Sequence, residues 1–406
     1  MPKICVKFNM GSFVDTKSHP SFLPITEENL RSTKVVVQTV PRTIKDVGAI
    51  IYTSGTSGKP KGVAIKNWLL ILVSTPTDWD VRYSKRYRPI RTFSCLPLFH
   101  GTCFFTGLMY SAGTSGTFCL GRKFSASGFS KALVDSRATR MLYVGEICRY
   151  LLRAAPSPYD KAHNCKVAVG NGLSKDVWLK FKERFGIEEI REFYRSTEGI
   201  AKFDNLSRGV AGAGKVGFQG PLYRIFNKHT FLVRYDPATE SPWRDPKTGF
   251  CKVARRGEPG EAIGVVTNMD VYHAYINNPA ANNEKLIADV FRKGDLYQRM
   301  GDLLVNETSG WVSFQDRTGD TYRWNGENVS AGEVREHISR IPGVADVTVY
   351  GVKLPGYDGQ AGAAAITLAP EHRTQEQDFA SALCGKLKKS GLTNYQIPRL
   401  IRFIEQ

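Results

Sequence analysis

A phosphate-binding loop is predicted by the segment IYTSGTSGKPKG, residues 51–62, which follows a short apolar run. Glycines in such a loop let the backbone turn several amide N–H groups toward one anion. Hydroxyl side chains add further donors, and lysines add positive charge. The residues that supply these features are Thr53, Ser54, Gly55, Thr56, Ser57, Gly58, Lys59 and Lys61.

Two other interpretations of this segment are weaker. A P-loop requires Ser or Thr directly after its Gly-Lys pair, whereas here Lys59 is followed by Pro60 and the pair Lys61-Gly62 by Val63. A mobile surface linker would also be rich in Ser, Thr and Gly. A linker, however, rarely follows a buried strand and carries a proline and two lysines in this order, so we favour the anion-binding interpretation.

Two patterns typical of other enzyme classes lack the necessary context. Residues 212–217, GAGKVG, form a literal G-x-G-x-x-G, but a dinucleotide site needs a strand before it and a helix after it. The preceding residues are DNLSRGVA, and Gly220-Pro221 is expected to break any following helix. No G-x-S-x-G nucleophile elbow occurs in the chain, which argues against a serine hydrolase.

The charge and the cysteines restrict the partners and the compartment. The 406 residues include 56 Lys and Arg against 38 Asp and Glu, a net charge of +18 that favours polyanionic ligands or acidic membrane surfaces. The basic residues are scattered without an arginine-rich tail, so no nucleic-acid partner is expected. The eight cysteines include no C-x-x-C pair and none clusters with histidine. We therefore expect neither a disulfide framework nor a zinc site. A reducing compartment is expected instead.

The stretch from Thr92 to Gly121 contains no Lys, Arg, Asp or Glu. A spanning helix needs roughly 20 predominantly apolar residues. Pro97 and His100 interrupt this stretch, and the block GTSGT at residues 113–117 predicts a turn between a buried helix and a buried strand. The N-terminus does not resemble a secretory signal, and the C-terminal RFIEQ carries no peroxisomal or lipidation motif.

The elements around the loop predict an α/β architecture. The segment VGAIIYTSG is expected to be a buried strand that runs into the glycine-rich turn, and KNWLLILVS a helix that buries its aliphatic face. A second, amphipathic helix is predicted over 174–185, with Ser174 as its N-cap and Gly186 at its end. The order of strand, glycine loop and helix favours an α/β fold.

The second half of the chain has a different character. Residues 202–260 are rich in turn residues and predict short strands and loops, and 301–314 predict a β-hairpin. A capping box at Ser330–Glu333 opens a helix that Pro342-Gly343 ends, and strands follow at 344–352 and 363–368. We therefore expect a large domain over 1–316, a hinge at 317–320 and a small α+β domain over 321–406.

The loop closely resembles the phosphate-binding signature of the adenylate-forming (AMP-binding) superfamily, roughly Y-T-S-G-[ST]-[TS]-G-x-P-K-G, which Tyr52 to Gly62 matches throughout. Further segments resemble other motifs of the superfamily in the expected order. These are LPLFH (96–100), EFYRSTEG (192–199), GD (301–302), DR (316–317) followed by GEN (326–328), and NYQIP (394–398).

Three other stretches resemble the branch of fatty acid transport proteins and very-long-chain acyl-CoA synthetases. They are YVGEICRYLL (143–152), GNGL (170–173) and GDTYRWNGENV (319–329). The resemblance extends from about residue 45 to the end. It implies an adenylate-forming fold, with a large multi-subdomain α/β N-terminal domain and a small α+β C-terminal domain. Both are expected to be incomplete, because the chain looks shortened at both ends relative to the family.

The resemblance implies an acid–thiol ligase that uses ATP, Mg²⁺ and coenzyme A. A carboxylate would attack the α-phosphate of ATP to give an acyl-adenylate and pyrophosphate, and the thiol of CoA would then displace AMP. By resemblance, Tyr52 and the loop hold the β- and γ-phosphates, and Glu198 binds Mg²⁺. Thr197 offers a hydroxyl to the α-phosphate, Asp302 accepts the ribose hydroxyls, and Arg317 donates to ribose or phosphate.

Two assignments leave alternatives open. Tyr194 would stack on adenine by resemblance, but core packing is an equal alternative. His100, Gly170 and Gly172 would line the acyl pocket, although His100 within an apolar segment is also typical of a core histidine. The family's adenylating lysine lies beyond the Y-x-x-P segment, whereas this chain stops at Gln406. The adenylation step is therefore expected to be impaired.

The expected function is an acyl-CoA synthetase for a long- or very-long-chain fatty acid or a related carboxylic acid. One alternative is a homologue that binds nucleotide or acyl-CoA without adenylation. Another is carboxylic acid activation in a secondary biosynthetic pathway. The expected partners are the acid, CoA and a membrane surface. The expected location is intracellular, at the periphery of a peroxisomal, endoplasmic reticulum or other membrane, or otherwise in the cytoplasm.

Overall fold

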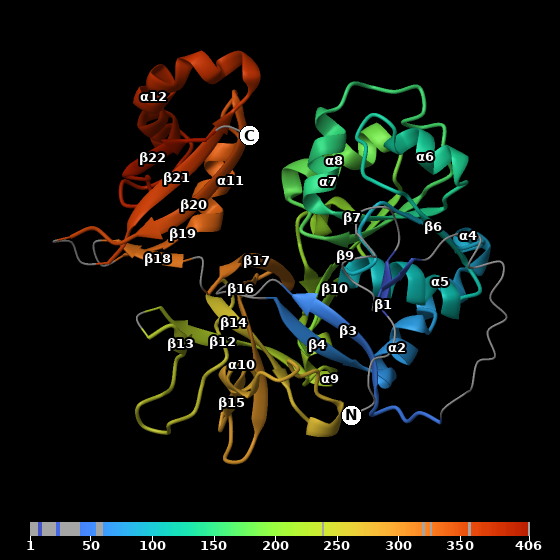
Figure 1. Ribbon diagram of the computed structural model, residues 1–406. Coiled ribbons are helices and arrows are strands. Elements are labelled where there is room, and N and C mark those ends of the chain that lie inside the picture. Colours follow the sequence, from blue (N-terminus) through green and yellow to red (C-terminus); the bar gives the residue numbers. More distant parts are fainter. Residues whose placement is uncertain are drawn as a thin grey trace. The chain divides into compact units, whose positions relative to one another are not determined.

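The arrangement of the chain is given by a computed structural model (Figure 1). It describes residues 7–9, 22–24, 41–53, 60–237, 239–318, 321–324, 327–355 and 359–404. The chain divides into two compact units, Met1–Thr43 and Ile44–Gln406. In the first unit, β1 (Lys7–Asn9) pairs in parallel with β2 (Phe22–Pro24). All elements described below belong to the second unit.

A six-stranded sheet positions most of the predicted motifs. Its order is β10-β9-β8-β7-β5-β6, and all neighbouring pairs are parallel except β9 and β10. Parallel strands end at one edge of their sheet, which is where ligands bind in α/β folds. The segments 96–100 and 195–199 follow β5 and β9 at that edge, and the segment 170–172 lies at the end of β8. The strands are β5 (Arg91–Ser94), β6 (Thr117–Leu120), β7 (Arg140–Val144), β8 (Val167–Asn171), β9 (Glu189–Tyr194) and β10 (Phe203–Asn205).

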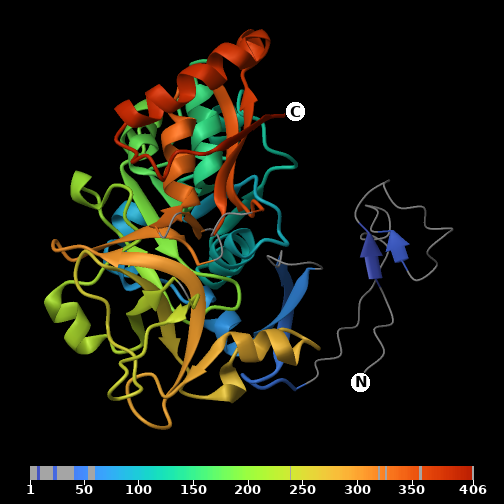
Figure 2. The same cartoon turned by 90° about the vertical axis from the view of Figure 1, so that its left-hand side faces the viewer.

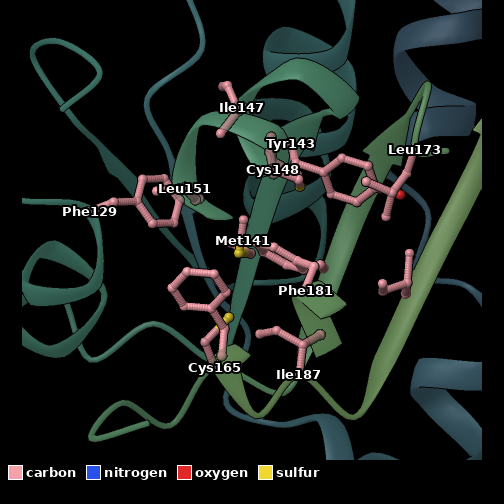
Figure 3. Packing of buried hydrophobic residues seen from close by; sticks show 14 of the residues in the cluster. Phe129, Met141, Tyr143, Ile147, Cys148, Leu151, Cys165, Leu173, Phe181 and Ile187 are labelled. Atoms are coloured by element: carbon pink, nitrogen blue, oxygen red, sulfur yellow. The ribbon is translucent and has the colours of Figure 1, made fainter. Parts of the chain in front are cut away.

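Helices that connect these strands cover the sheet and form its largest apolar core. Phe129, Leu151 and Phe181 come from three different helices and pack around Met141 and Tyr143 of β7 (Figure 3). The helices of this part are α3 (Asp78–Arg82), α4 (Ser84–Tyr87), η1 (a π-helix, Thr102–Met109), α5 (Tyr110–Gly113), α6 (Phe129–Asp135), α7 (Gly145–Arg153) and α8 (Lys175–Phe185).

The amphipathic helix predicted over 174–185 is confirmed as α8. Ser174 occupies the N-cap position, although its side chain forms no capping hydrogen bond, and Gly186 ends the helix with φ of 64°. That conformation is in the left-handed region, which glycine adopts without strain. Trp178 and Phe181 are buried as the spacing predicts.

The uncharged stretch 92–121 is not one helix. The predicted turn at 113–117 is confirmed, because it connects α5 with β6. The expectation that the following strand is buried is wrong: β6 lies at the edge of its sheet, and none of its residues is buried. Among the described residues, no helix has the length and apolar character needed to cross a membrane.

The predicted loop connects a two-stranded hairpin of β3 (Val47–Thr53) and β4 (Lys61–Lys66), which leads into α2 (Asn67–Ser74). The expectation of a buried strand is wrong for β3, where only Ile51 is buried, because β3 pairs with β4 alone and leaves one face uncovered. The expectation that α2 buries its aliphatic face is also wrong. No residue of α2 is buried, and its leucines at 69 and 70 are only partly covered.

A second, antiparallel sheet carries Asp302 and Arg317. Its order is β11-β17-β16-β14-β12-β13, with β15 paired to β16. The predicted hairpin is confirmed and longer than expected: it consists of β16 and β17 (orange in Figures 1 and 2). The strands are β11 (Gly217–Phe218), β12 (Thr230–Asp236), β13 (Ser241–Pro242), β14 (Pro259–Val265), β15 (Leu286–Ala288), β16 (Leu296–Asn306) and β17 (Trp311–Arg317).

Residues 202–260 form short strands and loops as predicted, with one exception. The expectation that Gly220-Pro221 breaks any helix is wrong, because the helix α9 (Pro221–Phe226) begins at this proline. Proline is suited to the first position of a helix, where its missing N–H would have no intrahelical partner. The remaining short elements of this part are η2 (Val210–Gly212), η3 (Met269–Val271) and α10 (Pro279–Glu284).

The C-terminal residues have an apolar core of their own, which includes Val334, Ile366 and Leu383. The N-cap half of the predicted capping box is confirmed, because the Ser330 hydroxyl accepts a hydrogen bond from the Glu333 amide at 3.0 Å. The Glu333 carboxylate accepts from the side-chain amide of Gln396 at 2.9 Å. The division into 1–316, 317–320 and 321–406 stays a prediction, which this separate core supports. The elements are β18 (Thr321–Trp324), β19 (Glu327–Ser330), α11 (Ala331–Ser339), β20 (Val344–Val352), β21 (Ala361–Leu368), η4 (Pro370–Gln375), α12 (Glu376–Lys389) and β22 (Leu400–Phe403).

A buried ionic network lies at the opposite ends of the parallel strands. Asp80 of α3 is 2% exposed and bonds Arg140 at 3.1 Å and Arg191 at 2.9 Å. Arg191 also donates to Glu189 at 2.6 Å, and the Tyr110 hydroxyl donates to Asp80 at 2.5 Å. Because Arg140 and Glu189 are the first residues of β7 and β9, the network is remote from the strand ends that carry the predicted motifs.

Candidate active site

Glu198 lies in the turn after β9 and is 8% exposed. The Tyr275 hydroxyl donates to its Oε1 at 2.7 Å. The backbone of the turn is held by Gln298 of β16, whose amide donates to the Glu198 carbonyl at 3.0 Å and accepts from the Ile200 N–H at 2.8 Å. The carboxylate is thus fixed between the two sheets of the large unit.

The residues that follow the predicted phosphate loop show where the loop lies. Residues 54–59 lie outside the described residues, so the predictions for Ser54, Gly55, Thr56, Ser57, Gly58 and Lys59 are not tested. After the loop, the Ala64 N–H donates to the Ala274 carbonyl at 3.0 Å, and the Ile276 N–H donates to the Gly62 carbonyl at 2.8 Å. The Lys61 ammonium lies 5.4 Å from the centroid of the Tyr275 ring. Since Tyr275 also bonds Glu198, the end of the loop lies beside this carboxylate.

The two residues before the loop differ in their environments. The Thr53 hydroxyl donates to the Lys61 carbonyl at 3.4 Å, which holds the two ends of the loop together. Tyr52 pairs with Gly62 in the hairpin, and its side chain is 68% exposed. The structure therefore brings Lys61 to Glu198 but leaves the Tyr52 side chain on the uncovered face of β3.

Lys285 adds a second positive charge to Glu198. Its ammonium is 3.6 Å from Oε1 of this carboxylate and donates to the Met300 carbonyl at 3.4 Å. Among the described residues, Oε2 of Glu198 has no hydrogen-bond partner. A Mg²⁺ ion is commonly held by one or two carboxylates together with substrate phosphates and water. The donor set at Glu198 therefore fits the predicted ion.

Burial and the negative charge of Glu198 raise the pKa of the Tyr275 hydroxyl. The hydroxyl therefore stays protonated at neutral pH and remains a donor to Glu198. Lys61 and Lys285 lie on this same side of the site, where anionic phosphates would need compensating charge.

Asp302 of β16 is held by the two residues that the sequence associates with the nucleotide. The Tyr194 hydroxyl donates to its Oδ2 at 2.5 Å. Arg317 is its register partner on β17, with Nε 3.7 Å from Oδ1. Burial raises the pKa of Asp302, against the opposing effects of Tyr194 and Arg317. The Tyr194 ring is 7% exposed and packs 5.8 Å from the Phe203 ring, so adenine stacking on it stays a prediction.

Replacing Asp302 with asparagine is expected to weaken ATP binding by roughly 10- to 100-fold, because hydrogen bonds to a charged group contribute about 1.5–3 kcal/mol. Isothermal titration calorimetry with ATP and Mg²⁺ measures this change. The matched control is Asp378→Asn on the exposed face of α12. Equal affinities for the two variants would remove Asp302 from the nucleotide site.

The residues predicted to line the acyl pocket form one neighbourhood. His100 Nδ1 accepts from the Thr102 N–H at 3.2 Å, and the Thr102 hydroxyl donates to Asn171 at 3.5 Å. Asn171 lies between Gly170 and Gly172, the other two predicted pocket residues. A Cβ atom added at Gly101 would lie 3.8 Å from the Thr197 hydroxyl, so this neighbourhood adjoins Thr197. The role of these residues in acyl binding stays a prediction.

The side chain of Glu192 forms hydrogen bonds that hold the turn at Gly172. Its Oε1 accepts from the Leu173 N–H at 3.1 Å, and its Oε2 accepts from the Tyr143 hydroxyl. Tyr143 and Leu173 lie next to each other in Figure 3. Gly172 has φ of 79°, which glycine adopts without strain. Burial raises the pKa of Glu192 to about 8, although the hydrogen bonds from Tyr143 and Leu173 lower it.

Replacing Glu192 with glutamine is expected to change the pH dependence of stability. A carboxyl in the unfolded chain titrates near about 4.3, so between this pH and 8 the folded protein holds a proton that the unfolded chain releases. This contribution is complete below the unfolded pKa and is lost as pH rises toward 8. As pH rises from 5 to 8, the free energy of unfolding of the variant should therefore increase by a few kcal/mol relative to that of the native chain. Urea unfolding at several pH values measures this difference. Parallel curves for both proteins would contradict this.

Sequence reasoning missed three residues of the site. Tyr275, Lys285 and Gln298 contact Glu198, but none belongs to a motif that resembles the family. The two tyrosines at 272 and 275 are the only signal in the sequence, and buried tyrosines are equally typical of core packing. Their contribution arises from tertiary contacts across 77 to 100 positions of sequence.

A family model described as AMP-binding enzyme matches residues 10–239, more than half of the 406-residue chain. The chain therefore belongs to the AMP-binding enzyme family, and the resemblance drawn from its motifs is confirmed.

Individual proteins of this family are similar to the chain over most of its length. The chain is 37% identical to the very long-chain fatty acid transport protein of Saccharomyces cerevisiae, over 88% of this chain and 54% of that protein. It is 36% identical to long-chain fatty acid transport protein 3 of Homo sapiens, over 90% of this chain and 51% of that protein. It is 38% identical to isopenicillin N epimerase component 1 of Hapsidospora chrysogena, over 89% and 59%. The chain thus spans about half the length of the curated relatives it matches.

Solved structures confirm the predicted fold. The o-succinylbenzoate CoA synthetase of Bacillus subtilis, in complex with its acyl-adenylate intermediate, matches with a TM-score of 0.74 at 20% identity, over 98% of this chain and 75% of that one. ATP-bound MatB from Rhodopseudomonas palustris matches with a TM-score of 0.68 at 22% identity, over 91% and 66%. At these identities the likeness establishes the adenylate-forming fold alone.

Proposed function

We propose that the protein is an ATP-dependent acid–thiol ligase that forms an acyl-adenylate and transfers the acyl group to CoA. One observation carries this proposal: Tyr275 connects the end of the predicted phosphate loop with the buried carboxylate of Glu198. Lysines at 61 and 285 supply positive charge beside that carboxylate. Asp302 lies on β16, the strand whose Gln298 holds the backbone of the turn at Glu198.

Each residue has a defined task in this proposal. Lys61 and the loop before it bind the β- and γ-phosphates, and Asp302 binds the ribose hydroxyls. Thr197 donates to the α-phosphate, and Arg317 orients Asp302 or donates to the nucleotide itself. Glu198 would hold Mg²⁺, which neutralises phosphate charge when bound. Tyr275 keeps the Glu198 side chain pointing into the site.

The proposed substrate is a long- or very-long-chain fatty acid, with activation coupled to fatty acid uptake and lipid transport. The names of the relatives in yeast and human support this choice. The pocket would adjoin His100, Gly170 and Gly172, next to Thr197. We propose that the protein works at the periphery of an intracellular membrane, peroxisomal or of the endoplasmic reticulum, where such acids accumulate.

The proposal has two alternatives, which the assays below distinguish from it. Activation of another carboxylic acid in a secondary biosynthetic pathway is favoured by the likeness to isopenicillin N epimerase component 1. Binding of nucleotide or acyl-CoA without adenylation is the second alternative, and pyrophosphate release distinguishes it from the ligase.

The test measures pyrophosphate release from ATP and Mg²⁺ with fatty acids of increasing chain length and with an aromatic carboxylic acid. Release that depends on a long-chain acid is expected. A second assay supplies pre-made acyl-adenylate and CoA, which isolates the transfer step from adenylation. ATP binding without pyrophosphate release from any acid would overturn the ligase proposal. Release with the aromatic acid alone would favour the secondary pathway.

A further inference from the structure

The helix α9 presents an apolar surface that the described residues of the second unit do not cover. None of its residues is buried, although four of the six are large and hydrophobic. The exposed fractions are 74% for Leu222, 46% for Tyr223, 60% for Ile225 and 84% for Phe226. Contiguous exposed apolar groups are rare on soluble surfaces and mark interaction sites.

Positive charge surrounds this helix. Arg224 lies within it, Lys228 follows it, and Arg256 approaches from the loop before β14. None of these three side chains forms an ion pair with a carboxylate in the part of the chain that the structure describes. Arg256 donates one hydrogen bond to the Thr308 carbonyl at 3.2 Å, but this neutral acceptor leaves its positive charge uncompensated. The charges of all three side chains can therefore attract an external anion.

A cavity of about 330 Å³ lies between α9 and the loop before β14. Arg224 and Arg256 line it together with the apolar side chains of Ile225 and Val253. Asn306 also lines it; this residue is 7% exposed, and its Oδ1 is buried without a hydrogen-bond partner among the described residues. The cavity thus offers two guanidinium groups for a phosphate and one buried acceptor for an ammonium or hydroxyl donor.

We propose that α9, with Lys228 and Arg256, docks the protein onto the surface of an anionic phospholipid bilayer. Charge complementarity selects this occupant, because a phospholipid headgroup carries both an anionic phosphate and polar donors, and its acyl chains accept apolar side chains. Short apolar segments rich in Lys or Arg bind membranes in the interfacial plane in this way. Each basic residue near an anionic surface strengthens such binding further.

The proposal deepens the membrane location included in the proposed function and names the surface responsible for it. A bound enzyme would receive an acid that partitions into the bilayer. Vesicle binding is measured without ATP or CoA, so loss of the ligase hypothesis would leave this test unaffected.

The test is flotation of the 406-residue protein with vesicles of phosphatidylcholine alone or with added phosphatidylserine. We expect binding to the anionic vesicles that weakens as salt is raised. The charge variant combines Arg224→Gln, Lys228→Gln and Arg256→Gln, and it should lower the partition coefficient on the order of 100-fold. The apolar variant combines Leu222→Ser, Ile225→Ser and Phe226→Ser, and it should lower it on the order of 10-fold or more.

Control variants change exposed groups elsewhere, three basic residues for the charge variant and one leucine for the apolar variant. Arg122→Gln, Lys123→Gln and Lys180→Gln together remove the same charge, and Leu179→Ser removes an exposed leucine from α8. These variants should bind as the native protein does, and circular dichroism checks that all variants fold. Equal binding by the α9 variants and the controls would overturn the proposal. The proposal would also be overturned if the native protein did not bind anionic vesicles and sedimented as a dimer that the apolar variant of α9 abolished.

Discussion

Replacing Glu198 with glutamine is expected to lower carboxylate-dependent pyrophosphate release on the order of 10²–10³-fold, while the fold survives. Glutamine keeps the size of the side chain and can still accept from the Tyr275 hydroxyl. It loses the negative charge that would bind Mg²⁺ and that faces Lys285. The Mg²⁺ dependence of ATP binding, titrated by calorimetry, should flatten in this variant.

Two further variants show whether the charge or the position of Glu198 matters. Tyr275→Phe removes the hydroxyl donor and should lower the rate about 10-fold, with Mg²⁺ dependence retained. Glu183→Gln changes an exposed carboxylate on α8 and should have no effect. An unchanged Mg²⁺ dependence in Glu198→Gln would assign this residue a structural role.

Replacing Asp80 with asparagine is expected to destabilise the protein by about 3–5 kcal/mol, because breaking a buried ion pair leaves an uncompensated charge. Arg140 and Arg191 are both buried and both depend on this carboxylate. Two nitrogens of Arg140, Nε and Nη2, already lack hydrogen-bond partners in the described part of the chain. Urea unfolding at pH 7 measures the loss.

The pH dependence gives this prediction a second readout. Burial alone would raise the pKa of Asp80, but the hydrogen bond from Arg191 and the charge of Arg140 outweigh it and hold the pKa well below its usual range. The stabilisation is therefore present above the unfolded pKa of about 3.9 and is lost as pH falls below it. The asparagine variant should lose less stability between pH 5 and 3 than the native protein.

The exposed Asp135, which pairs with Lys131 along α6, supplies the control. Asp135→Asn should leave the unfolding curve unchanged, because exposed ion pairs contribute little. Equal stability of Asp80→Asn and Asp135→Asn would show that the buried network does not stabilise this fold.

Elements with a strong local pattern could be predicted from the sequence. The apolar spacing in α8, the turn residues before β17 and the cap of α11 each act within a few residues, so neighbouring side chains determine the outcome. Burial of β3 and α2 could not be predicted this way. It depends on whether another part of the protein covers them, which the apolar composition of a segment does not determine.

The candidate site follows the same division. Glu198 and Asp302 stand in motifs whose residue order indicates their chemistry. The carboxyl ends of parallel strands also bring Thr197, His100 and Gly172 to one edge, as such sheets generally do. Tyr275 and Lys285 enter the site from the loops on either side of α10, which no local pattern relates to β9. Their contribution depends on how the antiparallel sheet packs against the parallel one.

The central claim is that a triphosphate and its metal bind between Lys61 and Glu198. A crystal structure with Mn²⁺ and a non-hydrolysable ATP analogue tests it most directly, because anomalous scattering locates the metal. We expect the Mn²⁺ peak at the Glu198 carboxylate, the phosphates against residues 53–61 and the ribose at Asp302. A nucleotide bound elsewhere, or a Mn²⁺ peak remote from Glu198, would contradict the account.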